Sequence, residues 1–465
     1  MRYSKGLRRE HKKTLQKREF LSGSTMICSF DLAKKKHAFH VLDGQRNVIT
    51  RGSVPHSHEG METLLERLEM LRTKVNCEHI VFFMEGASYF WMPVISLLRR
   101  KGYQYRLVEN KAVGHQRHLE GQAGRKNDPI DAAHIATLGS SLHFVFSQLS
   151  LDDKWISLRA CALEYQEMVD LITAEKNRIH AFLGTIFPKY YDIFHDPFKD
   201  TSLAVLSHLD AAYSLDVNDF VTCVRTSFTR KNLLIRRSKA IWAYVRSGDP
   251  WGYVEARPAL VKRIKAASER VQMFIKQQEQ LRDLLLAAYR KIPYSSNLDS
   301  IHGSSSIENA VLLGIVGDPK DFDEARALVS VAGLDPGERS SGQYHGKTRI
   351  TKAGRVHLRR AAISAVMTVL QSRKNPDFVR RFFFLQQRAN NPCKSLQALC
   401  ACASKYLRTV WWLCITNSVY QPQIAHYGFS KSEVKQLEQL TDEVIFEPIN
   451  VESQIFPSEG CEPVL

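Results

Sequence analysis

The chain has 465 residues, which is too long for a single ordinary core and predicts two or three domains. Its composition, 44% hydrophobic and 24% charged, is typical of a globular protein, and no apolar run is long enough to cross a bilayer. The basic N-terminus lacks the apolar segment of a signal peptide, and the nine cysteines include no Cys-x-x-Cys pair. We therefore expect a cytoplasmic protein without a zinc or disulfide framework.

The formal net charge of +17 favours a polyanionic partner, and both RNA and DNA satisfy it. This charge is unevenly distributed. Residues 1–20 hold eight Lys or Arg and two Glu, whereas residues 431–465 hold two Lys and eight Asp or Glu. Both tails are equally consistent with solvated, disordered chain ends, so the excess in the middle of the chain is the more informative part.

Residues 25–140 predict a domain in which three strands come first and helices then alternate with strands. The three strands form a meander, with Asp43-Gly44 as a turn between the second and third. Apolar residues at three- and four-residue spacing predict a helix at 58–75. The remaining predicted elements are a strand in "HIVFFME", a helix in "YFWMPVISLLRRKG", a strand in "YQYRLV" and a helix in "DPIDAAHIATLG". This order indicates an α/β domain with a mixed sheet.

Four acidic residues occupy the ends of these elements. Asp31 ends the first strand, Glu85 ends the fourth, and Asp128 and Asp131 lie three residues apart at a helix start, on the same face. Carboxylates brought together in this way repel one another unless a cation holds them. Oxygen ligands alone select a hard ion, Mg²⁺ or Mn²⁺, and two such ions would clamp a phosphodiester between its attacking and leaving oxygens.

Each acid also has a simpler interpretation. Asp128 has the position of a helix N-cap followed by Pro129 at the first helical residue. Asp31 is compatible with an ordinary turn at a strand end. Glu85 is hardest to explain in this way, because an acid directly after "IVFFM" must lie beside buried surface.

The region 150–300 is predicted to be mostly helical. A long amphipathic stretch ends at Pro188, and a second stretch places apolar residues at alternating spacings of four and three, interrupted at Gln278. The apolar positions of this second stretch are 260, 264, 267, 271, 274, 281, 285 and 288. Such a heptad pattern predicts a coiled coil that pairs subunits, and the alternative is a long helix packed within its own chain.

A glycine-rich, basic segment follows at 333–360, "GLDPGERSSGQYHGKTRITKAGRVHLRR". It holds two adjacent serines, Ser340 and Ser341, and then six cations: Lys347, Arg349, Lys352, Arg355, Arg359 and Arg360. One interpretation is a solvated basic loop. The other is a serine nucleophile that attacks a phosphate held by these cations, which would supply the positive field that a hydroxyl needs for activation.

Several of these segments resemble one family of insertion-sequence transposases of the DEDD type. The acid-bearing segments are "SFDLAKKKHAFHV", "FFMEGASYFWMPV" and "GRKNDPIDAAHIA", with Asn127 where many members have threonine. The C-terminal motif matches at Gly317-Asp318, Phe322, Gly333-Leu334, Pro336, Ser341-Gly342, Gly346, Arg349-Ile350, Lys352, Gly354 and Leu358-Arg359. The glycine-rich turn that precedes this motif in the family is altered here to "IHGSSSIENA". The resemblance covers roughly residues 25–420.

The resemblance implies an α/β RNase H-like (RuvC-like) N-terminal domain, a helical and coiled-coil region, and a mainly α-helical C-terminal domain with the catalytic serine. The expected boundaries are a basic extension at 1–24, the RNase H-like domain at 25–148, the helical region at 149–295, the C-terminal domain at 296–425 and an acidic tail at 426–465. It also implies that Asp31, Glu85, Asp128 and Asp131 are the metal-binding tetrad and that Ser341, rather than Ser340, is the nucleophile.

The same resemblance implies a recombinase that exchanges and religates DNA strands through a phosphoserine intermediate. Its implied partners are double-stranded DNA, a structured non-coding guide RNA and further copies of the chain, with tetrad and serine contributed by different subunits. The expected nucleic-acid contacts are Lys126, Lys347, Arg349, Lys352 and Arg359. Two alternatives stay open: a purely metal-dependent nuclease or Holliday-junction resolvase in which Ser341 is structural, and a non-enzymatic nucleic-acid-binding protein with decayed sites.

Overall fold

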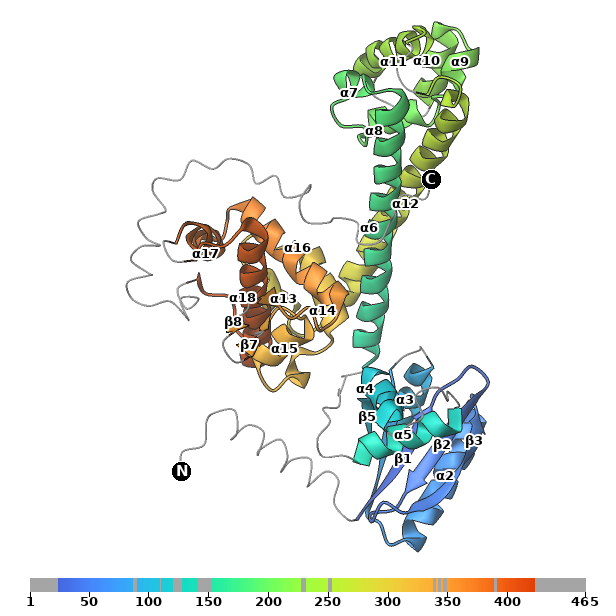
Figure 1. Ribbon diagram of the computed structural model, residues 1–465, viewed down its shortest axis with the longest axis vertical. Helices are drawn as coiled ribbons and strands as arrows, with labels where there is room; N and C mark the ends of the chain where they lie inside the picture. Colours follow the sequence, from blue (N-terminus) through green and yellow to red (C-terminus); the bar gives the residue numbers. More distant parts are fainter. Residues whose placement is uncertain are drawn as a thin grey trace. The chain divides into compact units, whose positions relative to one another are not determined.

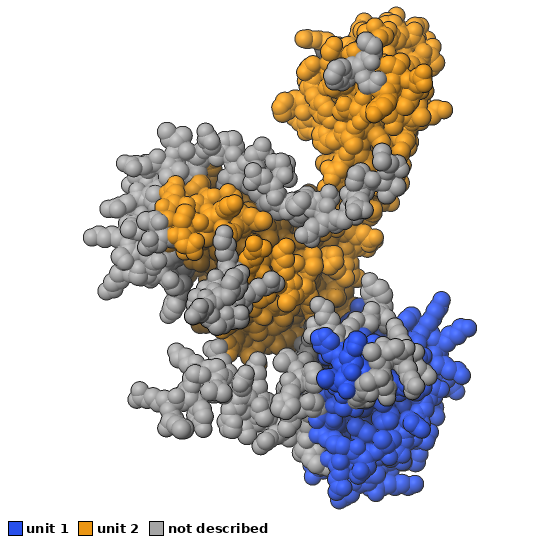
Figure 2. Space-filling model, viewed as in Figure 1, with its two compact units in different colours: residues 1–151 blue, residues 152–465 orange. Residues whose placement is uncertain are grey.

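A computed structural model describes most of the chain and divides it into two compact units, Met1–Leu151 and Asp152–Leu465 (Figures 1 and 2). The described residues are 24–86, 90–108, 110–119, 128–140, 152–226, 231–249, 253–337, 340–341, 344–345, 349–388 and 391–422. Both charged tails and the predicted contacts Lys126 and Lys347 lie outside these ranges. No helix within them is both long enough and apolar enough to span a membrane.

The first unit is built on a five-stranded mixed sheet with the order β3-β2-β1-β4-β5 (Figure 1). Its strands are β1 (Thr25–Asp31), β2 (Lys36–Leu42), β3 (Val48–Pro55), β4 (His79–Glu85) and β5 (Gln104–Val108). β1, β2 and β3 pair antiparallel, whereas β1, β4 and β5 pair parallel. The predicted α/β domain with a mixed sheet is therefore confirmed.

The described residues of this unit form the helices α2 (His58–Lys74), α3 (Trp91–Arg100), α4 (Asn110–Leu119) and α5 (Asp128–Ser140). The Ser57 side chain caps α2 by accepting a hydrogen bond from the Gly60 amide at 3.1 Å. The sequence predicted α2, α3 and α5 but not α4. The segment of α4 is largely polar, with no repeated apolar spacing to indicate a helix.

The helix α5 packs closely on one face of the sheet. Ile27, Val81 and Phe83 on that face share a buried core with Ile135 and Ala136 of α5. A Cβ atom on Gly139 would lie 2.7 Å from the Phe83 ring, so only glycine allows this approach of helix to sheet. The alternation of a strand then assigns the side chains of Ser29, Asp31 and Glu85 to the α5 face.

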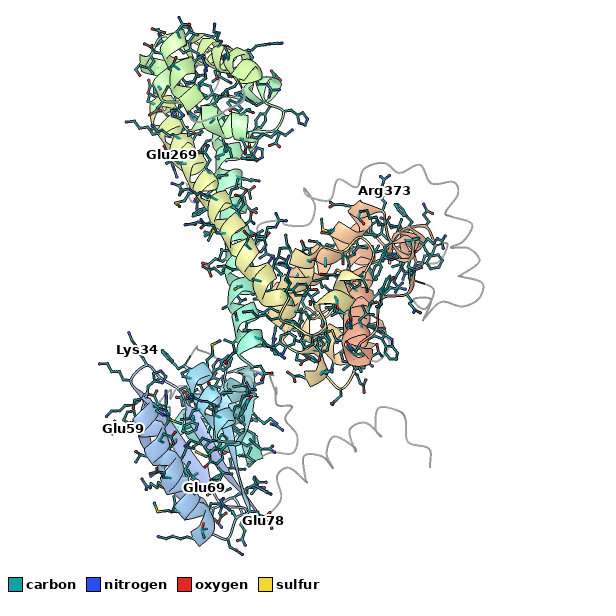
Figure 3. The ribbon with its side chains drawn as sticks, turned by 180° about the vertical axis from the view of Figure 1, so that it is seen from behind. Lys34, Glu59, Glu69, Glu78, Glu269 and Arg373 are labelled. Atoms are coloured by element: carbon teal, nitrogen blue, oxygen red, sulfur yellow. The ribbon has the colours of Figure 1, made fainter. Side chains whose placement is uncertain are left out.

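The second unit contains two long antiparallel helices, α6 (Asp153–Ile186) and α12 (Arg257–Tyr289), which lie side by side (Figures 1 and 3). The connection between them forms five shorter helices, α7 (Tyr190–Ile193), α8 (Asp200–Leu206), α9 (Ala211–Ser214), α10 (Val217–Thr226) and α11 (Lys231–Arg246). These helices share one buried core with parts of α6 and α12. The mostly helical region that the sequence predicted is confirmed.

The heptad positions of α12 point into the chain itself. Ile264 and Val271 are fully buried against residues of α6 and α8, and Leu285 is fully buried in the core of the C-terminal helices. An ion pair between Glu175 of α6 and Arg270 of α12, 2.8 Å from oxygen to nitrogen, bridges the two helices. The prediction that this seam pairs subunits is therefore wrong, because α6 of the same chain already occupies it.

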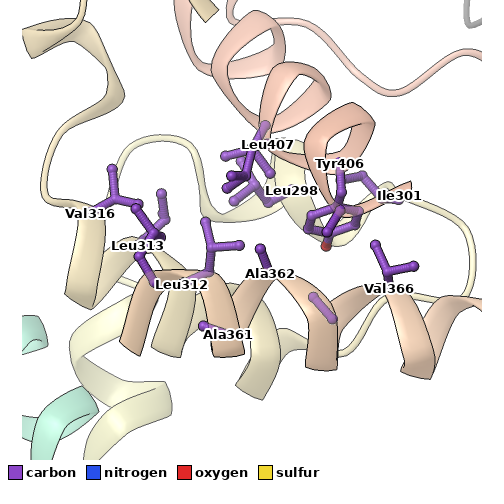
Figure 4. Close-up of a cluster of buried hydrophobic side chains, with 14 of the residues drawn as sticks. Leu298, Ile301, Leu312, Leu313, Val316, Ala361, Ala362, Val366, Tyr406 and Leu407 are labelled. Carbon is purple, nitrogen blue, oxygen red and sulfur yellow. The ribbon is translucent and has the colours of Figure 1, made fainter. Parts of the chain in front are cut away.

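The C-terminal part packs helices around a second core (Figure 4). Its elements are α13 (Ser295–Asp299), α14 (Ser306–Val316), the 3-10 helix η1 (Pro319–Asp321), α15 (Ala325–Val331), α16 (Val356–Ser372), α17 (Pro376–Gln387) and α18 (Ser395–Thr416). Figure 4 shows Ala362 and Val366 of α16 facing Tyr406 and Leu407 of α18. The Tyr406 hydroxyl donates to the Asn309 side chain at 2.5 Å, so its polar end is satisfied inside the core.

Candidate active site

Asp31 and Glu85 lie at the same edge of the sheet. β1 and β4 run parallel with Phe30 opposite Met84, so the next residues, Asp31 and Glu85, end neighbouring strands at the same level. Both are partly buried. Because both side chains belong to the α5 face, the two carboxylates occupy one corner of the sheet.

The start of α5 lies beside this corner. The Ser29 hydroxyl, two residues before Asp31, donates to the Ala132 carbonyl at 2.6 Å and ties β1 to the first turns of α5. The residue before Ala132 is Asp131, which is buried. Asp128, the first residue of α5, is exposed. The fold therefore ties the first turns of α5 to β1 near its end, while Asp128 lies at the solvent-facing start of the helix.

Arg117 of α4 pairs with Asp131, a contact that the sequence did not predict. Its Nε atom lies 3.4 Å from Asp131 Oδ1, and the two side chains are only 21% and 6% exposed. Neither of these two atoms has a hydrogen-bond partner among the described residues, so the interaction is an ion pair without good hydrogen-bond geometry. The guanidinium thus balances the charge of the most deeply buried acid. No sequence signal could have identified Arg117, because α4 itself was not predicted.

The donor atoms fit a hard divalent cation, although the present arrangement is not a closed coordination group. Across the described part of the chain, no three His, Cys, Asp or Glu side chains lie close enough together to hold a metal ion. Asp131 nevertheless has a buried oxygen that accepts no hydrogen bond, and the neighbouring strand ends carry the carboxylates of Asp31 and Glu85. Oxygen donors of this kind are those that Mg²⁺ and Mn²⁺ prefer.

The predicted serine belongs to a short hairpin in the second unit. β6 (Pro336–Gly337) pairs with β9 (Arg349–Ile350), and β7 (Ser340–Ser341) pairs with β8 (Tyr344–His345). Ser341 lies opposite Tyr344, and Ser340 lies opposite His345. The described structure of both serines is limited to the backbone, so this pairing does not distinguish between them.

The base of this hairpin depends on tight backbone packing. Gly333 has φ +64°, and a Cβ on it would lie 2.9 Å from the Lys352 carbonyl carbon. A Cβ on Gly354 would lie 2.4 Å from the Val331 carbonyl oxygen and 2.7 Å from the Gly333 nitrogen. Lys352 itself is left-handed, with φ +54°, and its amide donates to the Gly333 carbonyl at 3.1 Å. These glycines are therefore required by close approach of the two chain segments.

The cations of this segment divide into two groups. Arg349 and Lys352 are exposed and suit contact with a phosphate backbone. Arg355 and Arg359 instead point inward, each donating at 3.0 Å to a carbonyl at a helix end, Ile315 and Ala332 respectively. Burial, together with the nearby Arg159, lowers the pKa of Arg355 to about 10. Arg359 thus has a structural bond that the sequence-based assignment did not include.

Arg360 makes a bidentate ion pair with Asp170 of α6, and its Nη1 donates at 2.9 Å. It joins α16 to the long helix rather than extending the basic surface. Of the six cations that follow the serines in sequence, three therefore hold this part of the fold together.

Comparison with known proteins gives consistent results for both regions. Residues 28–188 match a family model for DEDD transposases of the IS110 type, described as a transposase. Residues 295–382 match a second model, described as the transposase IS116/IS110/IS902 family. A relative from Streptomyces coelicolor, the insertion element IS110 uncharacterized 43.6 kDa protein, is 22% identical over 410 residues. That alignment covers 86% of this chain and 96% of the relative.

Proposed function

Because the chain belongs to the IS110 family of insertion-sequence transposases, we propose that it cuts, exchanges and rejoins DNA strands with a carboxylate tetrad and a serine nucleophile. One observation carries this proposal: Asp31 and Glu85 end neighbouring parallel strands at one corner of the sheet, and the Ser29 hydroxyl ties β1 to the first turns of α5, the helix whose first turn holds Asp128 and Asp131. Two acidic side chains at adjacent strand ends repel each other unless a cation lies between them. The chemistry of these residues suits phosphodiester cleavage.

In this proposal, Asp31, Glu85, Asp128 and Asp131 would hold Mg²⁺ or Mn²⁺. Bound divalent metal would supply Lewis-acid stabilisation of the charge that develops on the phosphate oxygens. The chain itself contributes the fixed positions of Asp31 and Glu85 at two hydrogen-bonded strand ends. Arg117 balances the charge of the buried Asp131, and Asp128 would complete the set from the exposed start of α5.

Ser341 is proposed as the nucleophile. Its hydroxyl oxygen forms a bond to phosphorus while one bridging P–O bond of the strand breaks, so one phosphate ester replaces another. The serine proton is balanced by the proton that the departing strand oxygen takes up. A strand hydroxyl then attacks the phosphoserine, which restores the serine and rejoins DNA without an external energy source. The exposed Arg349 and Lys352 support the phosphate near this hairpin.

We further propose that a structured RNA guides target choice and that the active species contains several copies of the chain. The net charge of +17 supports nucleic-acid partners in general. Subunit pairing must use a surface other than the Ile264–Val271 seam, because α6 covers those positions. Sequencing the RNA that co-purifies with the protein tests the guide, and light scattering of the purified complex tests the assembly.

Strand cleavage of a plasmid that carries the gene and its flanking DNA tests the role of the acids. Asp31→Asn, Glu85→Gln and Asp131→Asn should each lower the cleavage rate by roughly a thousandfold or more, because each removes a ligand charge. Glu78→Gln is the matched control: Glu78 precedes the same strand, β4, at the opposite edge of the sheet and is exposed (Figure 3). Full cleavage by the Glu85→Gln variant would contradict the proposal.

A further inference from the structure

Three consecutive lysines follow β1: Lys34 and Lys35 lie in the turn after Asp31, and Lys36 is the first residue of β2. Lys34, Lys35 and Lys36 are all exposed, and none forms an ion pair with a carboxylate in the ranges that the structure describes. Adjacent cations repel one another, so their clustering is unfavourable for the protein alone. Because β2 begins where β1 ends, this turn lies at the edge of the sheet that holds Asp31 and Glu85. Lys34 is labelled at this end of the unit in Figure 3.

Two histidines fix the backbone of this turn at two points. The Ala33 amide donates to His37 Nδ1 at 3.2 Å, and the His56 amide donates to the Lys35 carbonyl at 3.0 Å. The rings are joined directly, with His37 Nε2 at 2.8 Å from His56 Nδ1. Since His37 Nδ1 accepts from an amide, the proton of the neutral ring must be on Nε2 and must donate to His56.

The same pair reaches the segment after Glu85. The His56 ring packs edge-on against Phe90, with the ring centroids 5.6 Å apart. Phe90 is the residue before α3, five residues after the end of β4. The histidines therefore join the chain that follows Asp31 to the chain that follows Glu85, on two strands that are neighbours in the sheet.

This arrangement has the properties of a positioning device. His37 is fully buried, and burial, followed by the influence of His56, lowers its pKa from 6.5 to about 4, so the ring is neutral near pH 7. A buried polar ring is retained at a free-energy cost unless both nitrogens are bonded, and here both are. The result is a rigid turn whose lysines are held at a defined place instead of on a loose loop.

We propose that the turn Ala33–Lys36 binds the phosphate backbone of the DNA strand that enters the acidic corner, with His37 and His56 as positioning residues for it. The inference rests on the proposed function of that corner. Carboxylates repel the polyanion that they are meant to cleave, and fixed cations a few residues away offset this repulsion. DNA is favoured over RNA as the ligand because the turn is continuous with Asp31, at the point where strand chemistry is proposed.

The first test measures binding to a DNA duplex of arbitrary sequence over a range of salt concentrations. The variant Lys34→Gln/Lys35→Gln/Lys36→Gln should bind with lower affinity, by roughly tenfold for each phosphate that is no longer bound. The slope of log affinity against log salt should also fall by about 0.9 for each such phosphate. The control Arg67→Gln/Lys74→Gln/Arg100→Gln removes three charges from exposed positions on α2 and α3 of the same unit. Equal slopes for the two variants would overturn the proposal.

The second test separates positioning from general stability by a double-mutant cycle. His37→Leu removes both ring bonds, whereas His37→Gln keeps one acceptor and one donor. His37→Leu should lower DNA affinity roughly tenfold in wild type but have little further effect in the triple lysine variant, because the turn no longer binds. His37→Gln should recover most of the affinity. Additive losses, or equal losses for both His37 variants, would overturn the positioning role.

The proposed function and this inference fail in different ways. If the wild-type protein cleaves plasmid DNA and the triple lysine variant binds the duplex as the wild type does, the inference is wrong and the function stands. If the triple variant loses affinity only for an RNA hairpin, or equally for the hairpin and the duplex, the assignment to DNA is wrong. If Asp31→Asn retains full cleavage, the proposed function itself is wrong.

Discussion

The acidic corner of the sheet and the serine hairpin are positioned by different kinds of structure. At the corner, Asp31 and Glu85 end regular strands, and Asp131 lies in the first turn of a regular helix. At the hairpin, Ser341 lies in a two-residue strand. The base of the hairpin depends on close glycine contacts and on the left-handed backbone of Lys352. Arginines bonded to carbonyls at helix ends also hold it. The acidic corner therefore follows from the repeating apolar patterns of strands and helices, whereas the hairpin follows from individual backbone conformations.

This contrast predicts where substitutions should be tolerated. A side chain on a strand end is held by the ladder of backbone bonds beneath it, so exchanging the side chain leaves the frame intact. The hairpin has few ladder bonds, and its position depends on side chains and glycines that have no catalytic role. Substitutions at the corner should thus mainly alter chemistry, whereas several substitutions around the hairpin should alter structure first.

The greatest loss of activity should occur at Ser341, where the hydroxyl is proposed to react. Ser341→Ala should abolish the covalent protein–DNA adduct seen on denaturing gels in the presence of Mg²⁺, DNA and co-purified RNA. Affinity for DNA should be unchanged, because the exposed cations Arg349 and Lys352 remain.

Ser340→Ala is the control for this experiment, and peptide mapping of the wild-type adduct identifies the linked residue. An adduct that persists in Ser341→Ala, or that maps to Ser340, would show that the motif match selected the wrong residue. Wild-type strand cleavage by Ser341→Ala, with no adduct in either protein, would favour a purely metal-dependent nuclease.

A smaller but still substantial effect concerns the charge balance of the corner. Arg117→Ala leaves the buried Asp131 carboxylate without its cation, which should lower the free energy of unfolding by about 3 kcal/mol. Combining it with Asp131→Asn should recover most of that loss, since the buried charge is then absent. Chemical denaturation of the four proteins measures the cycle. Equal losses in the presence and absence of Asp131 would mean that Arg117 acts by packing alone.

The sequence predicted the sheet well because strands and amphipathic helices leave repeating marks. Asp31 and Glu85 could be placed at neighbouring strand ends for the same reason, since each follows an apolar run. Arg117 was missed because α4 has no apolar period, and its pairing with Asp131 depends on a helix–helix contact that no local pattern encodes. His37 in β2 and His56 just after β3 were missed because the sequence around a histidine carries no sign of its partner on another segment.

The heptad of α12 shows a different limit. Its spacing correctly indicated a helix with a buried seam, but the same spacing serves a partner in another chain or in the same chain. The partner was identified only by three-dimensional contact with α6. Likewise, the inward bonds of Arg355 and Arg359 could not be predicted, because a run of cations looks the same whether it faces solvent or a carbonyl.

Two glycine substitutions, one in each region, test whether side chains or backbone limit the packing. Gly139→Ala at the sheet and Gly354→Ala at the hairpin should each destabilise by about 2 kcal/mol, because both add a methyl group where no space exists. Phe83→Leu should relieve the first, since its clash is with a side chain. No single side-chain change should relieve the second, whose nearest atoms belong to the backbone. Thermal melting compares the wild type, Gly139→Ala, Gly354→Ala and the double variant Gly139→Ala/Phe83→Leu. If Phe83→Leu did not restore the stability of Gly139→Ala, the distinction between side-chain and backbone limits would be wrong.

The weakest of these effects is a pH dependence at His37, and its sign follows from the direction of the shift. The pKa is about 4 in the folded protein against 6.5 for an ordinary histidine, so the unfolded chain takes up a proton first as the pH falls. Stability is therefore retained above about pH 6.5 and lost as the pH falls toward 4. Between pH 7.5 and 5.5 the free energy of unfolding should fall by about 1 kcal/mol because of His37.

Chemical denaturation of the wild type and of His37→Gln at both pH values measures this effect. Because glutamine cannot titrate, the free energy of unfolding of the variant should fall by that much less over this range. Amide exchange at Ala33 should rise at low pH in the wild type, because a protonated Nδ1 can no longer accept its bond. Identical pH profiles for the two proteins would mean that the turn is held by other contacts.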